Sequence, residues 1–106
     1  MYCNDILKTV RGDLFLINIY NDGRYDTSQG NKIKMTLRKT LNGEVLCTDS
    51  TTFKENGLTK LSFSPKEMED KEGFYYIDIE VSNTTRTFVT TPLVTELKVV
   101  KDVTHG

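Results

Sequence analysis

The chain of 106 residues has no tryptophan, one histidine, two cysteines and two prolines. The histidine, His105, lies one residue from the C-terminus, and chain ends are generally the least ordered parts of a domain. A Cys–His nucleophile pair would have to use this residue, and few other groups can exchange protons near neutral pH. We therefore expect no enzymatic activity and no catalytic residues.

The two cysteines, Cys3 and Cys47, are too few for a disulfide framework or a zinc site, so we expect two free thiols. Cys47 lies in an alternating segment and is expected to be a small core residue. The acidic cluster within residues 67–72 lacks the alternating oxygen ligands of a calcium loop, and a solvated helical turn is expected there instead. The sequence contains no glycine-rich phosphate loop. Neither a metal nor a cofactor is expected.

The chain also lacks a large excess of charge of either sign, and it lacks long apolar runs. The formal net charge is −1, whereas a nucleic-acid-binding protein usually has a basic excess. No apolar run approaches the roughly 20 residues that span a membrane, and Met1–Asp5 does not begin a secretory signal. Neither nucleic acid nor membrane is expected as a partner. The length favours one domain over residues 1–106, with short arms at 1–10 and 101–106.

What the chain does contain is apolar alternation with a period of two, which is typical of β-strands. The expected inward faces are Phe15, Ile17 and Ile19 in residues 13–20, Ile33, Met35 and Leu37 in 32–39, Leu61 and Phe63 in 58–63, and Tyr75, Ile77, Ile79 and Val81 in 74–81. Further strands are expected over 45–53, 86–90 and 93–100. Pro92 is expected to separate the last two, because proline cannot donate to a β-ladder.

Turn signals lie between these segments. Gly12 in Arg11-Gly12-Asp13 predicts a tight bend, and Asn42-Gly43 predicts a type I′ hairpin turn. The segments 21–23 and 54–57 are also expected to be turns. Ser64, Pro65 and Glu67 have the spacing of a capping box, which predicts a short helix of about two turns.

Seven or eight short strands with one short helical turn predict an all-β fold, an immunoglobulin-like β-sandwich of mainly antiparallel strands. The outward residues of 32–39 are basic, at Lys32, Lys34 and Arg38. Those of 74–81 are acidic, at Asp78 and Glu80. Opposite charges stabilise neighbouring strands, so these two strands are expected to pair.

The order of elements resembles a known family. The matching pieces are Arg11-Gly12-Asp13, Asn21-Asp22-Gly23, residues 33–39, Leu61-Ser62-Phe63-Ser64-Pro65, residues 73–79, and the ending Val99-Val100-Lys101-Asp102-Val103-Thr104. Over residues 9–104 the chain resembles the immunoglobulin-like domain at the N-terminus of phage baseplate upper proteins and of related phage head-fibre and tail proteins. Those relatives continue into a fibre or receptor-binding region, whereas this chain stops at His105-Gly106.

The resemblance implies a bacteriophage virion structural protein, located in the virion after assembly in the host bacterial cytoplasm. Its role would be that of an adaptor or decoration subunit, either a head fibre or capsid auxiliary protein or a part of the tail or baseplate. Other virion proteins would be its partners, and a cyclic homo-oligomer is expected, with a trimer as one arrangement.

Apolar residues that alternation leaves on the outward side are the candidate subunit interface: Leu14, Leu16, Tyr20, Val94 and Val100. Exposed apolar patches mark association sites, although burial of a strand on both faces would also explain these residues. The alternative function is a carbohydrate-binding β-sandwich that contacts host-surface glycans. In that case Tyr20, Tyr25 or Tyr76 would form the aromatic platform.

Overall fold

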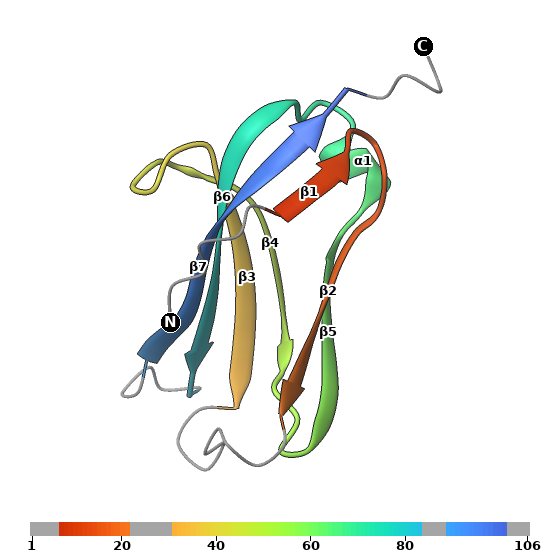
Figure 1. Ribbon diagram of the computed structural model, residues 1–106. Coiled ribbons are helices and arrows are strands. Elements are labelled where there is room, and N and C mark those ends of the chain that lie inside the picture. The colour runs from red at the N-terminus through yellow and green to blue at the C-terminus, as the bar shows by residue number, and fades with distance from the viewer. Residues whose placement is uncertain (1–6, 22–30, 84–88, 102–106) are drawn as a thin grey trace.

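The computed structural model describes residues 7–21, 31–83 and 89–101, in which two β-sheets pack face to face (Figure 1). The elements are β1 (Leu7–Val10), β2 (Phe15–Asn21), β3 (Lys32–Arg38), β4 (Val45–Thr52), β5 (Gly57–Phe63), α1 (Pro65–Met68), β6 (Gly73–Ser82) and β7 (Val89–Val100). The larger sheet has five strands in the order β1-β7-β6-β3-β4, and the smaller sheet consists of β2 and β5. The predicted all-β sandwich is confirmed.

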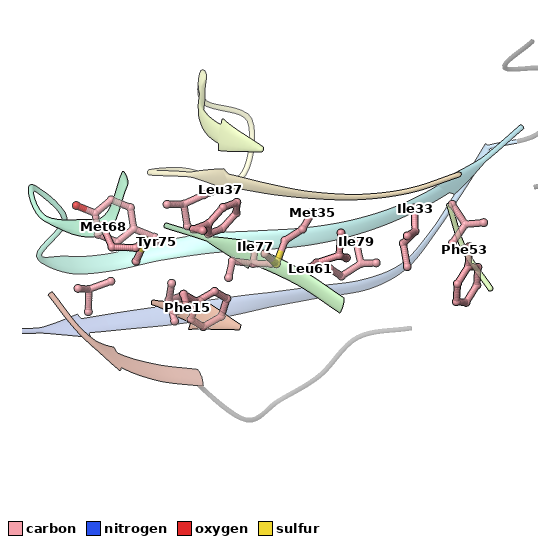
Figure 2. Close-up of a cluster of buried hydrophobic side chains, with 14 residues drawn as sticks. Phe15, Ile33, Met35, Leu37, Phe53, Leu61, Met68, Tyr75, Ile77 and Ile79 are labelled. Carbon is pink, nitrogen blue, oxygen red and sulfur yellow. The ribbon is translucent and has the colours of Figure 1, made fainter. Parts of the chain in front are cut away.

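The core lies between the two sheets, and the alternation predicted its members on β2, β3, β5 and β6 (Figure 2). Its buried apolar residues are Phe15, Ile33, Met35, Leu37, Phe53, Leu61, Phe63, Met68, Tyr75, Ile77, Ile79, Val81, Leu97 and Val99. The stacked rings of Phe15 and Phe63, with centroids 6.0 Å apart, belong to the β2–β5 layer. Ile17 and Ile19 point the same way as Phe15 and pack against the core while staying partly exposed.

The middle of the larger sheet is the antiparallel pair β3–β6, and the charge pattern predicted this pairing correctly. Lys34 lies opposite Glu80 in the ladder. Arg38 forms an ion pair with Asp78 on the outer face of the sheet. In this register the core residues of both strands point to the inner face. A slip by one residue would turn them outward.

Strand β7 corrects the expectation that Pro92 separates two strands. It runs without interruption from Val89 to Val100, so Pro92 does not separate two strands. The β6–β7 register shifts between Ile79 and Val81, at the level of Pro92, and β1 pairs with β7 only from Leu97 onwards. Proline is tolerated at a bulge and along an edge because no ladder hydrogen bond is required there. Residues 86–88 of the expected strand 86–90 lie outside the described residues.

The expected N-terminal arm, residues 1–10, contributes the edge strand β1. Its residues Leu7–Val10 pair with Leu97–Val100 in parallel, the one parallel pairing among the described strands of a fold that is otherwise antiparallel. Residues 1–6 of this arm and 102–106 of the C-terminal arm lie outside the described residues.

The connections follow the sequence signals in part. Gly12 has a φ of +84°, which confirms the predicted tight bend. Its N–H donates to the carbonyl of Met68 at 3.1 Å. The prediction of a type I′ turn at Asn42-Gly43 is wrong, because Gly43 does not have positive φ. A four-residue turn forms instead, in which the N–H of Gly43 donates to the carbonyl of Thr40 at 3.0 Å. A Cβ at Gly43 would lie 2.5 Å from the hydroxyl oxygen of Thr40, so a larger residue there would require the Thr40 side chain to move.

The capping box is confirmed. The Ser64 hydroxyl accepts from the Glu67 N–H at 3.1 Å, and the Glu67 carboxylate accepts from the Ser64 N–H at 2.9 Å. The helix is shorter than the two turns expected and ends after Met68, whose buried side chain closes one end of the core.

Two leucines of β5 provide a matched test of this packing. Leu61 is completely buried, whereas Leu58 is 52% exposed on the other face of the same strand. Leu61→Ala should lower the free energy of unfolding by roughly 2–5 kcal/mol, because it removes buried methyl groups and leaves a cavity. Leu58→Ala should cost no more than about 1 kcal/mol, because half of this side chain is already exposed to solvent. Urea unfolding followed by circular dichroism measures both values, and equal losses would contradict the assigned faces.

Candidate functional site

The outer face of the smaller sheet is apolar at four positions, which we call the β2–β5 patch: Leu14, Leu16, Tyr20 and Leu58. Their side chains are 55%, 44%, 60% and 52% exposed, respectively. Tyr20 lies opposite Leu58 in the β2–β5 ladder, and Leu14 directly precedes β2. Burial of β2 on both faces was the other explanation for these apolar residues. It is wrong here, because Leu14, Leu16 and Tyr20 are exposed.

The structure divides the five predicted interface residues between two surfaces. Leu14, Leu16 and Tyr20 belong to the β2–β5 patch. Val94 and Val100 lie on β7, and both are only partly exposed. Because Val94 is opposite Asp78 in the ladder, it lies on the outer face of the larger sheet, on the far side of the core.

Leu58 is a member of the patch that the sequence analysis missed. The sequence did indicate an outward position for Leu58, because this residue is out of phase with the inward residues Leu61 and Phe63 of the same strand. Its proximity to Tyr20 could not be found in the same way, because that depends on the pairing of β2 with β5, which are more than 30 residues apart.

A groove lies on the outer face of the larger sheet, with a volume of about 390 Å³. Its lining comes from β3, β6, β7 and the β3–β4 loop: Lys34, Thr36, Arg38, Leu41, Asn42, Tyr76, Ile77, Asp78, Glu80, Thr91 and Val94. The loop projects from the sheet (Figure 1) and supplies Leu41, which is 56% exposed. Thr36 lies on this outer face between Lys34 and Arg38 and is almost completely buried.

The Arg38–Asp78 ion pair organises this groove. The Arg38 guanidinium bonds Asp78 and also donates from Nε to the carbonyl of Gly43 at 3.2 Å, which ties the β3–β4 loop to the sheet. Burial raises the pKa of the Asp78 carboxyl above its ordinary value, and the charge of Glu80 raises it further, whereas Arg38 acts in the opposite direction. Asp78 therefore holds its charge in a poorly solvated position.

The acidic residues of segment 67–72 form contacts within the turn and with neighbouring segments. Glu67 caps α1, and Glu72 forms an ion pair with Arg11 at 3.5 Å. Asp70 pairs with Lys71 at 2.6 Å, and this hydrogen bond lowers the pKa of the Asp70 carboxyl. Within the described ranges, no three histidine, cysteine or acidic side chains are arranged to hold a metal ion.

Cys47 is half-buried against the core rather than fully inside it. Burial and the charge of Glu67 raise the pKa of its thiol to about 11 from the model-compound value of 9.0. A thiol with a raised pKa is a poor nucleophile near neutral pH. His105 and Cys3 lie outside the described residues. In the described part of the chain, no helix is long and apolar enough to cross a membrane.

Comparisons with known proteins bear on the fold. No protein-family model matches the sequence, and no curated protein matches it. The solved structure of the NK cell receptor Nkp44, described as a triggering partner in natural cytotoxicity, is similar with a TM-score of 0.53 and 14% sequence identity. The match covers 92% of this chain and 96% of the receptor chain. At this identity the likeness concerns the fold alone, and it confirms the predicted immunoglobulin-like sandwich.

The thiol of Cys47 can be tested by alkylation in a Cys3→Ser variant, in which Cys47 is the one remaining cysteine. The rate of reaction with iodoacetamide should rise with a midpoint near pH 11 in the folded protein and near 9 in urea. Because the folded pKa is the higher one, the stability contributed by the neutral thiol is complete below pH 9 and is lost as the pH rises through 11. Identical midpoints in both states would contradict the half-buried position.

Proposed function

We propose that this chain acts by protein–protein contact, as a small adaptor or decoration subunit of a bacteriophage virion. The observation that carries the proposal is the β2–β5 patch, in which Leu14, Leu16, Tyr20 and Leu58 expose apolar surface on one sheet face. The pair Asn18 and Lys60 lies between Leu16 and the Tyr20–Leu58 pair on this face. Exposed apolar residues gathered on one sheet face are typical of association sites. The virion as its location, on the head or on the tail or baseplate, rests on the order of sequence elements from Arg11-Gly12-Asp13 onwards.

The energetics favour action in several copies. Full burial of a large apolar side chain contributes about 1.5–3 kcal/mol, and the four patch residues have only about half of their surface left to bury. The patch would therefore contribute roughly 3–6 kcal/mol, while association costs about 4–15 kcal/mol in lost translational and rotational freedom. One patch gives weak binding. A cyclic homo-oligomer, for example a trimer, would present several patches at once and bind through avidity.

The proposed location is tested by mass spectrometry of purified particles that have been separated into heads and tails. The chain should be found in one of the two fractions, in a fixed ratio to a major structural protein. Its absence from both fractions, together with a monomeric protein in sedimentation experiments, would contradict the proposal.

The patch itself is tested by introducing a charge. Leu16→Glu should weaken binding to the partner particle at least tenfold, because a carboxylate would have to lose its solvation in the interface. The matched control is Val45→Glu, since Val45 is 49% exposed and lies on the other sheet. This control should leave binding unchanged. Both variants should keep the thermal unfolding midpoint of the original protein within a few degrees, and equal weakening by the two would argue against the patch.

A further inference from the structure

The groove on the outer face of the larger sheet carries no net charge. Lys34 and Arg38 contribute two positive charges to its lining, and Asp78 and Glu80 contribute two negative charges. These groups are matched across the β3–β6 ladder, Lys34 opposite Glu80 and Arg38 paired with Asp78. A phosphate, a carboxylate or a cationic ligand would find no excess of opposite charge. The groove is therefore suited to an uncharged, polar ligand.

Two polar groups of the groove, Arg38 and Asp78, are held in place and can form further hydrogen bonds. A guanidinium has five N–H donors, of which Arg38 uses Nη1 toward Asp78 and Nε toward the Gly43 carbonyl. Asp78 accepts from Arg38 through Oδ2, and a carboxylate can accept about four hydrogen bonds. The Asn42 amide lies beside them in the loop. Ligand hydroxyls, which both donate and accept, match this mixture of donors and acceptors.

An apolar wall lies next to these polar groups. Leu41, Tyr76 and Val94 line the groove and also a smaller adjoining pocket of about 100 Å³, so the two depressions share one wall. Tyr76 has an apolar ring with a polar tip, which suits a surface that is apolar on one side and solvated on the other. The volume of the groove lies within the range of about 300 to 1,000 Å³ found for small-ligand sites, although more of its lining is polar than is usual for such sites.

We propose that this groove binds a neutral saccharide unit. Tyr76 packs against the C–H face of the sugar ring, while Arg38 and Asp78 bond its hydroxyls. A hydroxyl that donates to Asp78 would also replace part of the solvation that burial removes from this carboxylate. Of the three tyrosines considered in the sequence, Tyr20 lies on the β2–β5 patch at the opposite side of the sandwich, and Tyr25 lies outside the described residues. The site is independent of the patch proposed for protein contact.

The test is a glycan array with the purified chain, followed by titration calorimetry with the strongest neutral oligosaccharide. Tyr76→Ala should weaken binding at least tenfold, and Tyr76→Phe, which keeps the ring, should restore most of it. Asp78→Asn should weaken binding by a smaller factor, because it removes a charged acceptor and keeps the shape. Tyr20→Ala, the matched control on the other face, should bind like the original chain.

The proposal would be overturned by no binding to any neutral glycan, by binding to charged glycans alone, or by equal losses for Tyr20→Ala and Tyr76→Ala. Binding of uncharged peptides in place of glycans would also overturn it. Leu16→Glu should leave glycan binding unchanged, so a failure of this site is distinguishable from a failure of the patch. Circular dichroism of each variant shows whether a lost signal comes from unfolding.

Discussion

The antiparallel pairing of β3 with β6 is the constraint on which the rest of the molecule depends. On the inner side it brings Met35 opposite Ile79 and Leu37 opposite Ile77, all nearly or completely buried. On the outer side the same register brings Arg38 to Asp78. Because side chains alternate along both strands, one register determines the core and the groove together. A slip by one residue would expose the core and remove the ion pair at the same time.

The two sheets are unequal, and this gives the molecule two different outer surfaces. The five-stranded sheet carries paired charges and is hollowed beneath the β3–β4 loop, where Arg38 holds the loop through Gly43. The two-stranded sheet has an open apolar face at Leu16 and Tyr20. The core separates these surfaces, so a protein partner on one side and a small polar ligand on the other would not compete. Because the two surfaces are separate, a substitution on one of them should leave binding at the other unchanged.

Local patterns predicted much of the fold, because they depend on short-range physics. Alternation placed the residues of β3 and β6, and the Ser64–Glu67 spacing predicted the capped turn. The errors arose where tertiary context decides. Pro92 stays within β7 because the ladder is irregular and at an edge there, and both features depend on the neighbouring strands. The groove was not predicted, since its lining comes from segments that only the strand order brings together.

We propose that the two faces of the sandwich have different partners, with protein contact on β2 and β5. Deuterium exchange of the chain, free and assembled in its particle, tests this most directly, because it reports each strand separately. We expect slower exchange in peptides covering Phe15–Asn21 and Gly57–Phe63 upon assembly, with little change over Gly73–Ser82. Protection confined to Gly73–Ser82 and Val89–Val100, with β2 and β5 unchanged, would contradict it.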